Sequence, residues 1–229
     1  MSGFRIALRY LEQGVIPPGR ITGTAIINEV IAMKFGSLVF AAIAALGGAA
    51  VGAAPLDKFV PPAVPSELAV YSNESAFLMA HAVGTQNYVC LPSGNTFAWT
   101  LFGPQATLFS EDGGQVITHF LSANPDEAGL PRATWQHSRD SSAVWAALSA
   151  MSTNAAYVDP NAIPWFLLRT VGKQTGPAAG DRLSQTSAIQ RVNTSGGKAP
   201  DTGCTLATHV GRKALVPYEA DYVFYQARQ

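Results

Sequence analysis

The sequence has few charged residues, and neither sign prevails. Charged residues make up 13% of the 229-residue chain, with 15 Lys and Arg against 15 Asp and Glu. Nucleic-acid binding needs a basic field or a basic cluster, and the sequence has neither, so we expect no nucleic-acid partner. Low charge with many Ser, Thr, Gly, Pro and aromatic residues favours a β-rich protein outside the cytoplasm over a helical cytosolic enzyme.

Local motifs of the common enzyme classes are also missing. The chain has no Gly-x-Ser-x-Gly elbow, and Lys198 lacks the glycine spacing of a phosphate-binding loop. Its four histidines, His81, His119, His137 and His209, show neither His-x-His nor His-x-x-x-His spacing. Metal ligands could therefore come together only through the fold.

The one long uncharged run has the layout of a secretory signal peptide. Met33-Lys34 is a short basic start, and the Ala/Gly/Leu-rich run that follows ends at Pro55. Cleavage after Ala53 fits the small-residue rule, so we predict a signal peptide at 33–53 and an upstream, mis-assigned start at 1–32. A transmembrane anchor is the alternative because the run is long enough to span a bilayer, although its Ala and Gly content makes it weakly hydrophobic.

Two cysteines, Cys90 and Cys204, lie in the predicted mature chain. An even number of cysteines in an oxidising compartment favours one disulfide, which would close a long loop. Two free buried thiols are the alternative.

Beyond the leader, the sequence predicts an extended Pro-rich segment at 54–68 and one β-rich domain at 69–229. Short apolar runs alternate there with turn residues, and Glu-Asp-Gly-Gly at 111–114 is typical of a hairpin turn. Residues 140–151 fit either a helix capped by Asp140 or a turn followed by a strand. We predict an all-β, single-domain sandwich or closed barrel of seven to nine antiparallel strands, with at most one or two short helices. The candidate strands are 86–91, 97–102, 106–110, 115–121, 165–171, 187–193, 214–218 and 221–225, with loops at 123–133, 172–181 and 194–203.

Several motifs within 66–226 occur together in a known pattern. They are Gly84-Thr85-Gln86-Asn87-Tyr88-Val89-Cys90, Trp99, Gly103-Pro104-Gln105-Ala106-Thr107-Leu108, His119-Phe120, Thr134-Trp135-Gln136, Ile163-Pro164-Trp165, 189–197, Pro200, Cys204 and 218–225. The pattern resembles a family of secreted bacterial and fungal proteins catalogued as a domain of unknown function. The resemblance implies secretion and pairing of the two cysteines, and it implies no activity.

Two details of that family bear on this chain. Its members usually have Asp-Gly-Ser where this sequence has Asp140-Ser141-Ser142. Some fungal relatives are labelled malate dehydrogenase, but this chain has no Gly-x-Gly-x-x-Gly after a strand to hold a nicotinamide, so we expect no such activity.

Candidate ligand-binding residues are His119, Trp135, His137 and Asp140. The aromatic face of Trp135 beside polar groups suits a small-ligand or sugar pocket, although the same residues also fit a turn with a core tryptophan. His119, between apolar neighbours on one strand face, is either a core-edge histidine or a ligand. Arg191 is expected to pair with a carboxylate.

We therefore predict a secreted or periplasmic binding or envelope-surface module of unknown ligand, without catalysis of its own or a cofactor. A small molecule or a sugar would suit its candidate pocket. The first alternative is a metal-dependent secreted enzyme in which His119 and His137 bind zinc or copper. The second is a structural surface protein that self-associates.

The leader makes a direct prediction for the natural protein. Mass spectrometry of the exported product should find an N-terminal peptide that begins at Ala54, because export removes residues up to Ala53. A peptide from 1–32 would contradict the upstream assignment, and a product that retains 33–53 would favour the anchor.

Overall fold

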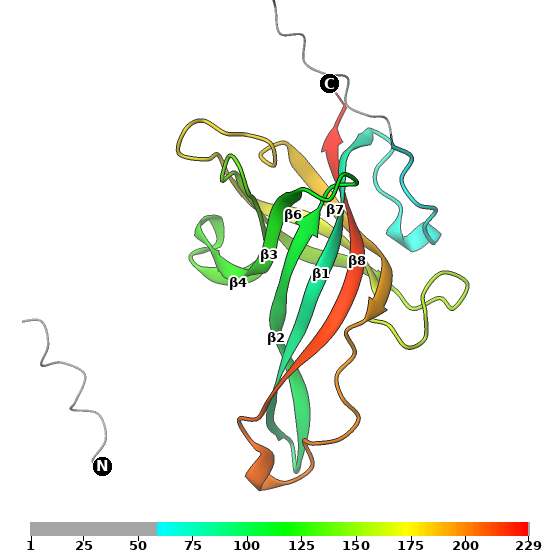
Figure 1. Ribbon diagram of the computed structural model, residues 1–229, viewed down its shortest axis with the longest axis vertical. Coiled ribbons are helices and arrows are strands. Elements are labelled where there is room, and N and C mark those ends of the chain that lie inside the picture. Colours follow the sequence, from blue (N-terminus) through cyan, green and yellow to red (C-terminus); the bar gives the residue numbers. More distant parts are fainter. Residues whose placement is uncertain (1–58, 229) are drawn as a thin grey trace, which may run out of the picture. The chain divides into compact units, whose positions relative to one another are not determined.

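A computed structural model describes residues 59–228, and the predicted leader and upstream residues lie outside this range. The described residues form a closed barrel of eight antiparallel strands, each paired with its neighbours in sequence, with β8 paired to β1 (Figure 1). The all-β prediction is confirmed, as a barrel rather than a sandwich. The strands are β1 (Glu74–Ser93), β2 (Thr96–Phe109), β3 (Gln115–Asn124), β4 (Leu130–His137), β5 (Ala143–Ser152), β6 (Trp165–Gln174), β7 (Thr186–Gly196) and β8 (Lys213–Ala227).

Helical structure is limited, between residues 59 and 228, to three short 3-10 turns: η1 (Ser66–Leu68), η2 (Pro125–Glu127) and η3 (Ala207–His209). No helix in this part of the chain is long and apolar enough to cross a membrane.

The long strands are continuous where the sequence suggested breaks. β2 covers both 97–102 and most of 106–110, and β8 covers both predicted C-terminal strands. Gly103-Pro104 lies beside a bulge, since Asn87 pairs with Gly103 whereas Tyr88 pairs with Leu101. The extra residue in this bulge is Phe102. A bulge accommodates a proline and re-aims the neighbouring side chain, so these residues redirect β2 rather than end it.

Residues 143–152 form a strand rather than a helix, which settles the alternative left open by the sequence. β5 pairs with β4 and β6, and its first half is buried. The turn before β5 is closed by two backbone hydrogen bonds, from His137 N to Ser142 O at 2.9 Å and from Ser141 N to His137 O at 3.0 Å. Ser141 has a φ of 61°, in the left-handed region that glycine adopts most easily.

Two layers of apolar side chains hold the barrel together. The interior cluster includes Leu108, Ile117 and Phe224, each completely buried. A second cluster lies on the outer face of β6, β7 and β8, where η1 supplies the completely buried Leu68. The Gln190 amide reinforces this contact by donating to Leu68 O at 2.7 Å. The described part of the Pro-rich segment, residues 59–68, is therefore packed against the barrel wall.

The predicted disulfide is confirmed between Cys90 on β1 and Cys204 in the segment that precedes β8, 114 residues apart in sequence. No free cysteine remains, so the alternative of two thiols is wrong. Beside the bridge, Cys90 N donates to Arg212 O and Gly211 N donates to Cys90 O, both at 2.9 Å. The disulfide thus fastens the β7–β8 connection to the long β1–β2 hairpin.

The left-handed Ser141 generates a stability prediction. Ser141→Gly should stabilise the protein by about 0.5–1 kcal/mol, because it removes the Cβ strain of a positive φ at the cost of some unfolded-state entropy. The measurement is urea unfolding at neutral pH. Ser93→Gly, in the extended backbone of β1, is the matched control and should be neutral or destabilising. If the Ser141→Gly variant is no more stable than wild type, the inferred backbone strain at Ser141 is wrong.

Candidate functional site

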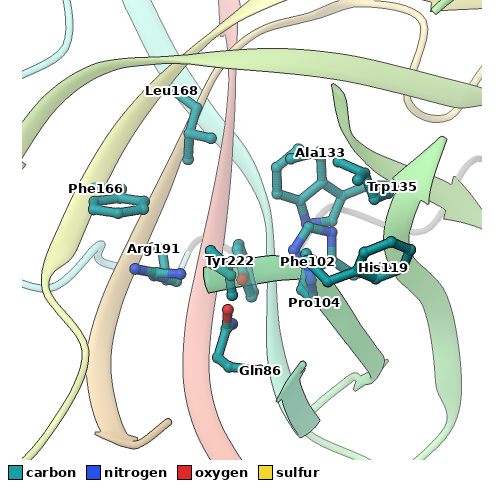
Figure 2. A pocket seen from close by; sticks show the side chains of 13 residues that line it. Gln86, Phe102, Pro104, His119, Ala133, Trp135, Phe166, Leu168, Arg191 and Tyr222 are labelled. Carbon is teal, nitrogen blue, oxygen red and sulfur yellow. The ribbon is translucent and has the colours of Figure 1, made fainter. Parts of the chain in front are cut away.

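Seven of the eight strands line one cavity inside the barrel, with a volume of about 310 Å³ (Figure 2). We call it the barrel cavity. Most of its wall is apolar, and the polar side chains come from β1, β3, β7 and β8. The lining residues are Gln86, Leu101, Phe102, Gly103, Pro104, His119, Leu121, Ala133, Trp135, Phe166, Leu168, Arg191 and Tyr222.

His119 and Trp135 form one wall of the barrel cavity. They are directly paired across β3 and β4, and their rings stack with centroids 4.2 Å apart and planes inclined by 12°. Tyr222 from β8 packs edge-on against both, at 5.1 Å and 5.6 Å. Two of the predicted ligand residues therefore lie side by side in the barrel interior (Figure 2).

Burial keeps His119 uncharged. His119 is 2% exposed, and desolvation lowers the pKa of its imidazole to about 3, against a smaller opposing effect of the Thr134 carbonyl. Nδ1 lies 2.8 Å from Thr134 O, and a carbonyl can only accept, so Nδ1 carries the proton and Nε2 keeps its lone pair. His119 thus offers the cavity an acceptor and an aromatic face rather than a positive charge.

The polar groups of the barrel cavity are incompletely satisfied. Gln86 Nε2, Trp135 Nε1 and Arg191 Nε are buried without a hydrogen-bond partner in the described structure. Three such atoms around one cavity are unusual, since buried polar atoms are nearly always paired and cost about 1–3 kcal/mol each when they are not.

Arg191 does not form the ion pair that the sequence predicted. None of the ion pairs among residues 59–228 includes it. Its guanidinium lies 3.9 Å above the Phe166 ring, and Nη2 donates to Pro164 O at 2.8 Å. The prediction fails because Arg191 points into the barrel, where the lining residues include no Asp or Glu.

His137 and Asp140 lie in a different hollow, of about 730 Å³, near the β4–β5 turn. We call it the rim hollow. Arg139 and Arg182 also line the rim hollow. The four predicted ligand residues are therefore divided between the barrel cavity and the rim hollow. The rim-hollow residues are Phe59, Phe77, Leu78, Met79, Ser110, Glu111, Asp112, Val116, His137, Arg139, Asp140 and Arg182.

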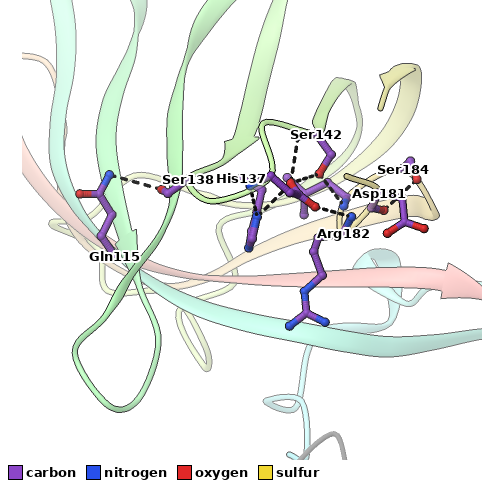
Figure 3. A network of polar contacts seen from close by, with 9 residues as sticks. Gln115, His137, Ser138, Ser142, Asp181, Arg182 and Ser184 are labelled. Atoms are coloured by element: carbon purple, nitrogen blue, oxygen red, sulfur yellow. Dashed lines mark hydrogen bonds and ion pairs between the residues drawn. The ribbon is translucent and has the colours of Figure 1, made fainter. Parts of the chain in front are cut away.

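Hydrogen bonds within the chain occupy the Asp140 carboxylate. Figure 3 labels three residues that contact it, His137, Ser142 and Arg182. Oδ1 accepts from the Ser142 amide at 3.0 Å and from the Ser142 hydroxyl at 2.7 Å, and Oδ2 accepts from Arg182 N at 3.0 Å. His137 Nδ1 lies 3.0 Å from Oδ1. Asp140 therefore ties the β4–β5 turn to the segment before β7, which is a structural task.

A metal ion between His119 and His137 finds no further support in the structure. The two side chains line different cavities, and no group of three or more His, Cys, Asp or Glu residues within 59–228 is arranged to hold a metal ion.

Sequence reasoning missed Gln86, Phe102 and Tyr222. Gln86 and Tyr222 lie on β1 and β8, the first and last strands, which meet only when the barrel closes. Phe102 looked like an ordinary strand residue, and the bulge that turns it toward the cavity depends on the pairing of β1 with β2. The Gly103-Pro104 dipeptide was the one sequence indication of that bulge.

Asp140 makes a pH prediction. Burial alone raises the pKa of its carboxyl, but the Arg182 amide, the Ser142 hydroxyl and the Ser142 amide outweigh it and hold the pKa at about 2. A pKa lowered by folding stabilises the protein above the unfolded value of about 4, and the gain is lost as the pH falls toward 2. Asp140→Asn should cost about 1–3 kcal/mol at pH 7, and its difference from wild type should shrink between pH 4 and pH 2.

Denaturant unfolding across this pH range measures the effect. Asp181→Asn is the matched control, because it removes the same charge from an exposed position in the adjoining segment and should change stability little. A stability difference between wild type and Asp140→Asn that stays constant from pH 7 to pH 2 would contradict the assigned role.

Comparison with known proteins gives one result. No curated protein matches the chain. No solved structure matches it either. The sequence profile of a family described as "Protein of unknown function (DUF3455)" matches residues 71–226, which include all eight strands of the barrel except Ala227, the last residue of β8. The chain therefore belongs to the DUF3455 family of proteins of unknown function.

Proposed function

We propose that this protein is a secreted or periplasmic binding module that takes a small molecule into the barrel cavity and performs no catalysis of its own. The observation that carries the proposal is the apolar barrel cavity with buried polar atoms that lack partners. Unpaired donors beside a cavity support a ligand that accepts hydrogen bonds from them.

The dimensions of the barrel cavity support this proposal. An eight-stranded barrel has an interior just wide enough to be filled by side chains or to hold one small ligand. Here side chains such as Leu108 and Ile117 fill part of the interior, and about 310 Å³ remains open beside His119. This volume lies at the lower end of the range for small-molecule sites, which is about 300–1,000 Å³.

The chemistry of the lining favours binding over catalysis. None of the lining residues carries a hydroxyl nucleophile of Ser or Thr, a thiol or a carboxylate. His119 has no acid partner to orient it, since its Nδ1 proton is directed to a backbone carbonyl. A stacked His–Trp wall is instead a flat, apolar surface that suits an aromatic or ring-shaped ligand.

Export is supported by the covalent structure. The disulfide between Cys90 and Cys204 suits an oxidising compartment, and it agrees with the signal peptide predicted at 33–53.

A pair of naphthalene probes tests the proposal. Titration calorimetry of the oxidised protein with 2-naphthoate and 2-naphthalenemethanol should detect saturable binding of at least one. Ala133→Phe should weaken that binding about tenfold or more, because the added ring occupies the cavity beside Trp135.

Ala98→Phe is the matched control, since Ala98 is exposed on β2 and does not line the cavity. Circular dichroism confirms that both variants are folded. The proposal is wrong if neither probe binds wild type, or if Ala133→Phe and Ala98→Phe bind the probes equally well.

A further inference from the structure

We infer that the ligand of the barrel cavity is an organic acid, with a carboxylate held by Arg191 and an apolar, ring-bearing body against the His119–Trp135 wall. This inference rests on the proposed function and specifies its ligand class. It follows from the charge inside the barrel, from the donors that surround it and from the shape of the remaining wall.

Arg191 is a buried cation without a counter-ion in the described structure. It is 7% exposed, and arginine remains protonated in any protein environment. The five ion pairs of residues 59–228 involve other side chains. A buried charge is costly unless it is paired, so an anion that enters the cavity gains an attraction that water screens poorly there.

The other polar groups around Arg191 are donors or neutral. Gln86 is 2% exposed, and its Nε2 has no partner. Tyr222 directly faces Arg191 across β7 and β8, and its hydroxyl lies 3.3 Å from that of Tyr218. No Asp or Glu lines the cavity, so nothing within it repels an anion. In Figure 2, Gln86 and Arg191 lie beside Tyr222, whose ring also packs edge-on against His119 at 5.1 Å.

The guanidinium is held in a fixed orientation. The Phe166 ring covers one of its faces at 3.9 Å, and Nη2 is anchored to Pro164 O at 2.8 Å. Nε keeps its N–H unpaired. A planar, pre-oriented guanidinium suits a planar carboxylate, which can accept two parallel N–H bonds, better than it suits a neutral hydroxyl.

The rest of the wall determines the body of the ligand. Phe102 and Leu121, which are 70% and 38% exposed, provide apolar surface beside the almost completely buried Trp135. His119 adds a neutral aromatic face stacked on Trp135. A small acid with an aromatic or other ring system therefore matches both the charged and the apolar parts of the cavity.

The two naphthalene probes distinguish this inference from the proposed function, because they share a ring system and differ in the charge of the head group. Wild type at neutral pH should bind 2-naphthoate about tenfold or more tightly than 2-naphthalenemethanol. Arg191→Gln should abolish the preference while it leaves the affinity for the alcohol within about twofold. Arg191→Lys should keep part of the preference, since lysine retains the charge but not the planar fork.

Arg132→Gln is the matched control, because Arg132 pairs with Glu127 and does not line the cavity. It should leave the preference unchanged. Equal affinity of wild type for the two probes would overturn the inference and leave the proposed function intact, and so would an undiminished preference in Arg191→Gln. If Arg191→Gln does not fold, the wild-type comparison alone decides. Absence of binding for both probes would overturn the proposed function and the inference with it.

Discussion

The pairing of β1 with β8 is the constraint on which the rest of this structure depends. It runs from Glu74 and Ala227 to Val89 and Lys213, over almost the full length of both strands, and it turns an open meander into a closed barrel. Closure removes the two sheet edges and creates an interior that water reaches poorly. Only then do Gln86 and Tyr222, from opposite ends of the domain, face the same cavity. The burial of His119 and Arg191, and with it the lowered pKa of His119, depends on a closed barrel.

Inside the barrel, the sizes of the inward-pointing side chains determine which part of the interior is filled and which part stays open. The inward positions Ala80 and Ala82 on β1 and Ala106 on β2 are small, and the rings of Tyr218 and Phe224 on β8 pack in the same interior cluster. Leu108 and Ile117 help to fill it, while bulged β2 leaves room beside His119. The barrel thus has a conventional apolar core and, next to it, an incompletely filled space whose wall is mostly apolar but includes a few buried polar groups, which a packed core alone does not require.

The local elements of this architecture could be predicted from the sequence. The features that depend on pairing between distant strands could not. The shared face of Ile117, His119 and Leu121 indicated a strand at β3, and the hairpin residues at 111–114 placed the turn. The Cys90–Cys204 pair was predictable from compartment and family resemblance. Arg191 was misread, because a single strand does not reveal whether its neighbours supply a carboxylate. Asp140 had the right composition for a ligand, but turn geometry commits its oxygens to Ser142 and Arg182.

The polar groups of the rim hollow and of the barrel cavity differ in how completely the chain itself satisfies them. At the rim, each carboxylate oxygen of Asp140 already accepts from the chain, so a ligand there would have to displace bonds that fold the loops. In the barrel cavity, Arg191 and Gln86 have donors to spare, and a ligand would add bonds without breaking any. Binding free energy is gained where the protein has left its own groups unsatisfied. That asymmetry, more than the size of either hollow, is the reason for proposing the smaller cavity as the ligand site.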